Sequence, residues 1–415
     1  MKITKQDLAE TRDESPLELF KQGIRAEETL TRYTNTLRRV LCDILEEILE
    51  GTFEQRAAQL VAEGKKNPEW VRDILLLISK KQRERTCLPR DHPDYFNPSS
   101  MRNFFKPIKK LLDMNDIGLS WKRIYATFPE IDNVQESHGW TREEIRTMLR
   151  FCDGPIERAI ILVAASSGMR LGGLEMKWDH IRPIYHGKKG LSFEQGTEIA
   201  CATISVYSGT SSAYPAFITP ETYAALQDYA LVWKQEVGRT PLPDDPVFKK
   251  SGSAAVAADT PALKRRIDKI AKKAGLREAD RKRERRFDVP IMNGFRRFWN
   301  KTCKEASSRD SPLASLIKKE YMMGHAGLVS LDRNYFKTRT LELAEEYLLV
   351  IPALTMNEAE ELRQVNRAQE ETIRMFRDEK DARILRLEEM MGEMIRKYEL
   401  EHRPAPRPLK KLELS

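Results

Sequence analysis

The stretch from Pro155 to Ser167 is almost wholly apolar over its whole length. A helix that is apolar on every side must be surrounded by other elements, so this stretch predicts a helix at the centre of a hydrophobic core. Gly168 is expected to end the helix, and Arg170 follows it. The sequence therefore predicts a buried helix with an arginine just beyond its carboxyl end.

The chain of 415 residues is long for one average domain, which favours two globular units with accessory segments. Residues 1–15 are polar and are expected to form a flexible arm. Helical periodicity fills residues 16–135, where we expect helices near 30–45, 54–63, 69–82, 99–114 and 121–126. Thr141 and Glu144 form a capping box that starts a new helix, so a second domain is predicted over residues 136–352.

The second domain is predicted to be mainly helical with a small β-sheet. Residues 200–207 and 213–218 are rich in β-branched and aromatic residues and flank a Ser/Gly-rich turn, which indicates a hairpin. Thr219-Pro220 places threonine at an N-cap and proline at the first helical position, and Thr260-Pro261 repeats that signal. The whole chain is thus expected to be mainly α.

Residues 357–401 contain no proline and carry dense charges of both signs, which predicts one long helix. Apolar residues give a broken heptad seam that is interrupted by polar residues such as Lys380. Two interpretations remain open: a coiled coil between copies, or a lone charged helix that packs on its own domain. Residues 402–415 are basic and proline-rich, and a disordered tail is expected.

Positive charge is concentrated in one stretch. The net charge is +8, and residues 264–286 hold twelve lysines and arginines against four acids, an excess as large as that of the whole chain. Such a stretch favours contact with the phosphates of nucleic acid, with a solvated helix face as the alternative. The residues expected to contact DNA are Lys264, Arg265, Arg266, Lys272, Lys273, Arg281, Lys282 and Arg283.

The five cysteines are far apart and have no metal-ligand spacing, so they are expected to be reduced thiols. The sequence has no paired acidic ligands of the kind that hold catalytic metal ions, and no phosphate-binding loop. The longest apolar run is too short to span a bilayer, and no early targeting segment is apparent. A soluble, cytoplasmic protein without membrane contact is therefore expected.

Three short segments in order carry the most chemistry: GMRLGGLEMKW at 168–178, NGFRRF at 293–298 and MGHAGLVSLDRNY at 323–335. Together they resemble the active site of the tyrosine recombinases, and residues 206–221 resemble those of archaeal-type integrases. The resemblance implies a helical core-binding domain followed by a mixed catalytic domain. It also implies DNA cleavage and rejoining through a 3′-phosphotyrosine. By the same resemblance neither a metal nor another cofactor is expected, since arginines do the work that metal ions do in many nucleases.

By this resemblance, Tyr335 is the nucleophile, and Arg170 and Arg296 hold the phosphate. His325 would hold a non-bridging oxygen or the nucleophile itself. Asn293 stands where the family has a histidine, so its part could only be to position the phosphate. The predicted hairpin lacks the family's lysine, for which Lys188 and Lys189 are the nearest substitutes.

The resemblance implies a site-specific recombinase that integrates or excises a mobile element at attachment sites in double-stranded DNA. Four protomers are expected around two duplexes, and a helix at 341–350 could reach a neighbouring protomer. Two alternatives remain: a catalytically impaired DNA-binding accessory protein, which Asn293 and the missing lysine suggest, and a type IB topoisomerase, which uses similar chemistry as a monomer.

Overall fold

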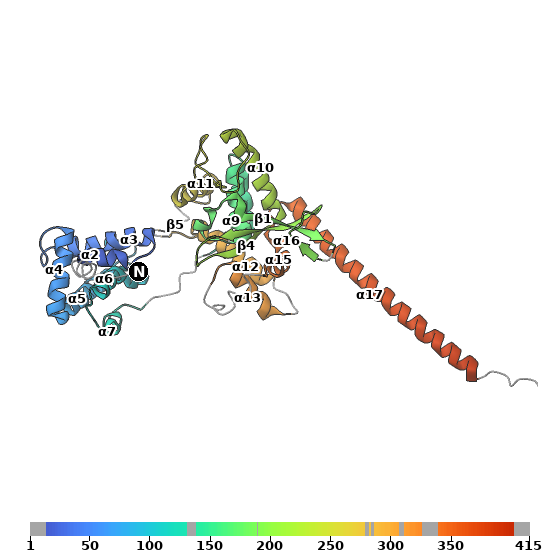
Figure 1. Ribbon diagram of the computed structural model, residues 1–415, viewed down its shortest axis with the longest axis horizontal. Coiled ribbons are helices and arrows are strands. Elements are labelled where there is room, and N and C mark those ends of the chain that lie inside the picture. The colour runs from blue at the N-terminus through green and yellow to red at the C-terminus, as the bar shows by residue number, and fades with distance from the viewer. Residues whose placement is uncertain are drawn as a thin grey trace, which may run out of the picture. The chain divides into compact units, whose positions relative to one another are not determined.

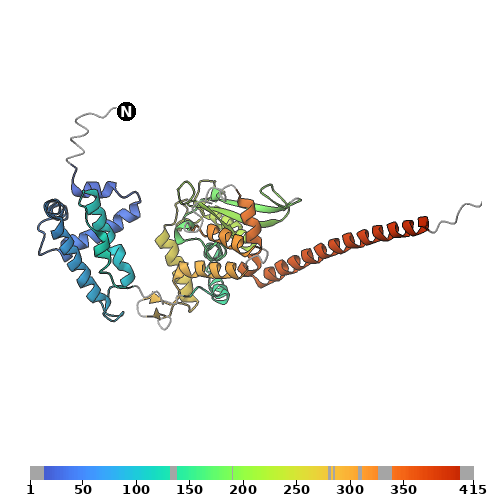
Figure 2. The same ribbon diagram turned by 90° about the horizontal axis from the view of Figure 1, so that it is seen from below.

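The computed structural model describes residues 14–130, 138–188, 190–278, 282–283, 286–306, 311–325 and 339–401. The chain divides into two compact units, one of residues 1–136 with 283–286 and one of residues 137–282 with 287–415. Figures 1 and 2 show helices alone in the first unit, from blue to cyan, and helices around a sheet in the second. The prediction of a mainly helical fold with a small sheet is confirmed.

The described part of the first unit is helical throughout. Side-chain caps fix where several helices begin, since Ser15 and Thr52 each form a capping box with the residue three positions on. Ser15 therefore belongs to the first helix and not to the arm. The elements are α2 Pro16–Gln22, α3 Glu27–Arg38, the π-helical η1 Arg39–Ile44, α4 Phe53–Lys66, α5 Pro68–Thr86, the short η2 Pro98–Ser100, α6 Met101–Met114 and α7 Trp121–Tyr125.

The second unit is built around α9 Pro155–Ser167, where residues 159–167 are all buried. Helices from five different parts of the sequence contact it, which confirms the predicted central helix. These neighbours are α8 Arg142–Arg150, α10 Pro220–Val237, α11 Thr260–Lys273, α12 Ile291–Glu305 and α16 Ile351–Leu354. The remaining helical elements are η3 Leu171–Leu174, η4 Trp178–His180, α13 Pro312–Met322, α15 Thr340–Leu348 and α17 Glu358–Glu401.

The sheet of the second unit has four antiparallel strands in the order β2-β1-β3-β4. The predicted hairpin is confirmed as β3 Ile199–Val206 and β4 Tyr214–Ile218, with Ile204 opposite Ala216. Sequence patterns missed β1 Ile181–Gly187 and β2 Gly190–Ser192. Pro183 lies inside β1, and only Ile184 of that strand is fully buried, so neither residue alternation nor composition marked a strand. A further short pair is β5 Lys282–Arg283 with β6 Arg286–Phe287.

One local prediction was wrong. Asp259, not Thr260, caps α11: its carboxylate accepts the Ala262 N–H at 2.7 Å, while the Thr260 hydroxyl and N–H both donate to Glu175. Aspartate caps at least as well as threonine, which explains the shift by one residue. The helix within residues 341–350, which could reach a neighbouring protomer, is α15, and it buries Leu343 and Tyr347 within its own unit. Its contact with a neighbour stays a prediction.

The long C-terminal helix is confirmed as α17, which contacts α16 at its start. Its first turn is held by an ion pair of 3.4 Å between Arg146 and Glu358. Residues 373–398 of α17 are exposed apart from Gly392, so neither interpretation of its apolar residues is tested within one chain. Among the described helices, none is both long and apolar enough to cross a membrane.

Candidate active site

Arg170 is presented by a tight turn at the end of the buried helix α9. Gly168 takes a left-handed conformation, with φ of 59°, and a Cβ at that position would lie 2.7 Å from the ring of Trp299. Glycine is therefore required both by the turn and by the close approach. The exposed Arg170 points Nη1 at the carbonyl oxygen of Gly324, 3.5 Å away.

Arg296 comes from the middle of α12 and is 9% exposed. Its guanidinium donates to the carbonyl oxygens of Gly168, at 2.9 Å, and Met323, at 2.7 Å. A third contact of 2.6 Å joins its Nη2 to Nε2 of His325. Arg296 thus connects the turn that precedes Arg170 with the segment that carries His325.

No carboxylate neutralises this pair of arginines within the described residues. All three groups bonded to Arg296 are uncharged oxygens or a ring nitrogen, and burial followed by the charge of Arg170 lowers the pKa of Arg296. Buried cations in proteins are usually paired with anions, because desolvation otherwise makes them costly. Two converging guanidiniums without an acid form a site for an external anion such as phosphate.

His325 is oriented by Glu320. Arginine has no acceptor, so His325 Nε2 must accept from Arg296, and a neutral imidazole then carries its proton on Nδ1. That nitrogen lies 2.5 Å from Glu320 Oε2, to which it donates. Burial raises the pKa of Glu320, but hydrogen bonds and charges from His325 and Lys304 outweigh burial and leave the pKa lowered. An ionised Glu320 therefore fixes both the orientation and the tautomer of His325.

Two tyrosines of the β3–β4 hairpin also lie at this site, and sequence reasoning missed them. Tyr207 packs beside Gly172, and its ring meets that of Tyr214 with centroids 6.1 Å apart. Tyr214 in turn lies against Gly324, where a Cβ would come within 2.5 Å of the ring. The hairpin that lacks the family's lysine thus places two phenols next to the arginines.

Burial raises the pKa of both phenols, and Arg170 and Arg296 partly counter this effect. Tyr207 has a φ of 54°, which is unusual for a residue other than glycine and is often found at functional sites. The buried Tyr214 hydroxyl forms no hydrogen bond with a described group, although Arg296 is close enough to affect the pKa of Tyr214. The site therefore holds phenol hydroxyls that can still donate hydrogen bonds, beside positive charge that no described acid neutralises.

The structure does not bring every predicted residue to this place. Asn293 lies one helical turn before Arg296 on α12, with its side chain exposed and without a side-chain hydrogen bond to the described part of the chain. Lys188 lies in the β1–β2 turn, while the arginines lie by the opposite end of β3. A strand of seven residues spans roughly 20 Å, so Lys188 is far from Arg170. Tyr335 and Lys189 lie outside the described residues.

The predicted DNA-contacting residues of α11 fall into two groups. Lys264 and Arg265 are exposed, and no ion pair links either to a described residue. The other three are paired with acids of their own chain: Arg266 with Glu157 at 2.7 Å, Lys272 with Asp268 at 2.9 Å and Lys273 with Asp153 at 2.5 Å. Arg281 and the side chains of Lys282 and Arg283 lie outside the described part of the structure.

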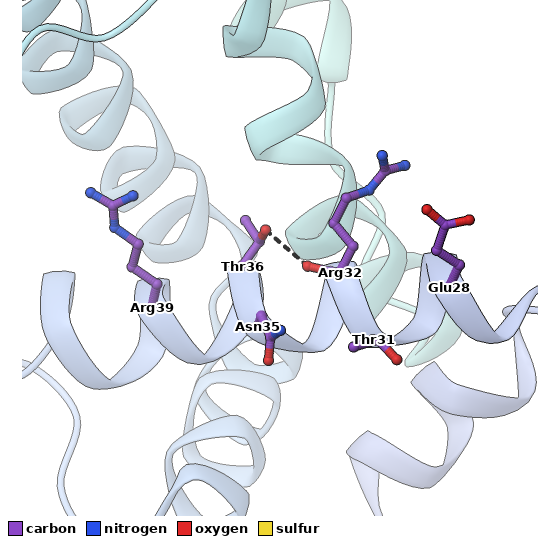
Figure 3. Close-up of a pocket in the computed structure, with 6 residues that line it drawn as sticks. All are labelled: Glu28, Thr31, Arg32, Asn35, Thr36 and Arg39. Atoms are coloured by element: carbon purple, nitrogen blue, oxygen red, sulfur yellow. Dashed lines mark hydrogen bonds between the residues drawn. The ribbon is translucent and has the colours of Figure 1, made fainter. Parts of the chain in front are cut away.

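A shallow hollow lies on the first unit, along α3 and the start of η1 (Figure 3). Polar and charged side chains line it, and the Thr36 hydroxyl donates to the backbone of Arg32 at 3.0 Å. Arg32 and Arg39 are both exposed and lie seven residues apart, on one face of the helix. The lining residues are Glu28, Thr31, Arg32, Asn35, Thr36 and Arg39.

The described residues contain no group of three or more histidine, cysteine or acidic side chains arranged to hold a metal ion. His325 and Glu320 form a pair only, and the contact of His325 with Arg296 occupies its second nitrogen. The described side chains of the site offer guanidinium, imidazole, carboxylate and phenol groups.

No protein-family model and no curated protein matches the sequence. Comparison of structures finds similarity to tyrosine recombinases. XerA recombinase shares 14% identity at a TM-score of 0.33, over 85% of this chain and 97% of that one. XerH site-specific recombinase, in a post-cleavage complex with palindromic difH substrate, shares 14% at 0.44, over 80% and 92%. A lambda integrase dimer bound to a COC′ core site shares 12% at 0.42, over 83% and 95%.

Proposed function

We propose that the protein is a site-specific DNA recombinase that cuts and rejoins DNA through a phosphotyrosine at Tyr335. One observation carries this proposal: Arg170 and Arg296 converge without a neutralising acid among the described residues, beside a histidine that precedes Tyr335 by ten residues. The arginines would bind the non-bridging oxygens of one phosphodiester, where charge accumulates in the transition state. The free energy of the broken bond would be kept in the phosphotyrosine, so rejoining needs no nucleotide.

The tautomer of His325 decides which of its two expected roles is possible, that of holding a non-bridging oxygen or that of holding the nucleophile. An Nε2 that accepts cannot donate to a phosphate oxygen, but it can accept the hydroxyl proton of Tyr335. We propose that the bound phosphate draws the Arg296 N–H away from His325 Nε2, that Tyr335 Oη then attacks phosphorus while its proton passes to the freed Nε2, and that Glu320 stabilises the resulting imidazolium. A free phenol is ionised in only about one molecule in a thousand at neutral pH, so this acceptor matters.

The bond from phosphorus to the 5′ oxygen breaks in the same step, and that oxygen needs a proton. Tyr207 is the proposed donor, because it lies on the hairpin beside the arginines and burial keeps its phenol protonated. A phenol is a stronger acid than the alcohol that leaves, and the resulting phenolate would lie near two guanidiniums. Lys188 lies too far away for this role.

Binding of duplex DNA would involve both units. On α11, Lys264 and Arg265 form no ion pair with a described acid that would compete with phosphate. Arg32 on α3 and Arg39 at the start of η1 offer two more cations. We propose that the substrates are attachment sites of a mobile element and that four protomers assemble on two duplexes. Among the similar proteins, XerH is bound to its difH substrate and the lambda integrase dimer to a COC′ core site.

A nicked suicide substrate tests the proposal. Its cleaved 5′ fragment diffuses away, so wild-type protein should accumulate a covalent adduct that resists denaturant, whereas Tyr335→Phe should bind the same DNA and form none. Absence of an adduct with wild-type protein on DNA that it binds would instead favour the accessory protein. Relaxation of supercoils by a monomer without strand exchange would favour the topoisomerase.

The role of Tyr207 has its own test. Tyr207→Phe should cleave ordinary DNA slowly but recover on DNA whose scissile 5′ oxygen is replaced by sulfur, because a thiolate leaves without a proton. Arg170→Ala serves as the control, since loss of phosphate binding should not be rescued by sulfur. Equal rescue of both variants, or no rescue of Tyr207→Phe, would contradict this role.

A further inference from the structure

The apolar residues of α17 repeat every eleven residues. Leu362, Ile373, Ile384 and Ile395 form one series, and a second series three positions later consists of 365, Phe376, Leu387 and Tyr398, where 365 is valine. Eleven residues make about three full turns of an α-helix, so each series forms a nearly straight row along one face. We call these two rows together the α17 stripe. The heptad seam expected from the sequence looks broken because the apolar residues repeat every eleven positions and not every seven.

The described side chains of the α17 stripe are exposed. Ile384 is the least accessible at 43% and Phe376 the most at 67%, and the stripe runs along roughly 55 Å of helix from Leu362 to Tyr398. No described element of the chain covers it. A continuous apolar row of this length on an isolated helix is unfavourable in water and is typical of a surface that meets a partner.

We infer that the α17 stripe binds the same stripe of a second copy, as a parallel two-stranded coil. Charge placement favours this partner and this direction. On α17, Asp381 and Glu388 lie on one side of the stripe, and Arg383 lies on the other. In a parallel pair, opposite sides of the two helices face each other, so each Arg383 meets acids of its partner. An antiparallel pair would place like sides together.

Lys380 lies at the centre of the stripe, seven residues after Ile373. In the parallel pair two lysines would face each other there, which lowers affinity but penalises shifted registers. The period of eleven, longer than three turns, predicts a coil with a right-handed or nearly straight course. The root of the helix is fixed to its own unit by Arg146 and Glu358, so the pair would join two second units.

Sedimentation equilibrium of the full chain without DNA tests this pairing apart from any DNA chemistry. Wild-type protein should dimerise, and Ile384→Glu with Ile395→Glu should weaken the dimer roughly 100-fold, because both charges would be buried in the contact. Met375→Glu with Leu385→Glu is the matched control, since both residues are exposed on α17 outside the stripe. Its affinity should be that of wild type.

Lys380→Ile should tighten the dimer. Direction is tested with Leu362→Cys and Tyr398→Cys as separate variants: each should crosslink to itself on oxidation, with wild-type protein as the background for the exposed Cys87. A monomeric wild type, equal loss of dimer in the stripe and control variants, or crosslinking only when the two cysteine variants are mixed would overturn the inference.

Discussion

The arginine pair of the site and the basic face of α11 carry the same charge in opposite settings. Arg296 is buried among carbonyl oxygens and a ring nitrogen, with Arg170 beside it and no acid among the described residues. On α11, three of five predicted contacts are exposed or half-buried cations that pair with Glu157, Asp268 or Asp153. The number of positive charges therefore says less about anion binding than the number left without a neutralising partner.

The largest effect on DNA cleavage is expected from Arg296→Lys. Lysine keeps the charge but cannot hold Gly168, Met323 and His325 at once, so DNA cleavage should fall by about 10²- to 10³-fold. Affinity for DNA should change little, because most phosphate contacts lie elsewhere. Single-turnover cleavage and a binding titration measure the two effects. An equal loss of cleavage and of affinity would show that the arginine pair of the site does not differ from the basic face of α11.

The next largest effect is expected in DNA binding, between two double variants of α11. Lys264→Ala with Arg265→Ala should weaken DNA binding and reduce the slope of log affinity against log salt by about 1.8, because two phosphate contacts are lost. Cleavage at saturating DNA should not change. Lys272→Ala with Lys273→Ala removes the same charge from groups already paired with acids and should leave the slope nearly unchanged. Equal slopes for the two double variants would show that internal pairing does not matter.

Glu320→Gln should slow cleavage less than Arg296→Lys and should alter the response to pH. The pKa of Glu320 lies below its ordinary value of 4.5 in the folded protein, so its stabilising effect is present above that pH and is lost as the pH falls through the folded pKa. The wild type should therefore melt higher than the variant at pH 7, with the gap closing in acid. A gap that is the same at pH 3 and pH 7 would exclude the ionised pair with His325.

The smallest effect is expected at the start of α11. Asp259→Ala should lower the free energy of unfolding by about 1 kcal/mol, because the N–H of Ala262 loses its acceptor. Denaturant titration measures the loss, and cleavage per folded molecule should be retained. A similar loss of cleavage would mean that the cap also positions the site.

Local signals were sufficient to predict the elements that present Arg170. The apolar run of α9, its terminal glycine and the hairpin each depend on residues close together in sequence, and all were found. Arg296 could be chosen from its motif, but its burial without an acid depends on Gly168, 128 residues away. Tyr207 and Tyr214 could not be linked to the arginines, since no pattern reveals a positive φ or a contact with Gly324.

Glu320 could have been found, because it precedes His325 by five residues near the end of a predicted helix. What no sequence pattern indicated was the pairing state of the α11 cations. Their acids Glu157 and Asp153 lie more than one hundred residues earlier in the chain, and tertiary contacts alone bring them together.

The carbonyl oxygen of Ser166 accepts hydrogen bonds from Trp299 on α12, at 2.8 Å, and from Tyr347 on α15, at 2.7 Å. Tyr335 is only four residues before Arg339, where α15 is about to begin, so an extended chain lets it move at most about 14 Å from that point. We predict that each protomer cuts with its own tyrosine. Mixing Arg296→Lys with Tyr335→Phe protomers should not restore cleavage, as it would if nucleophiles were exchanged between subunits.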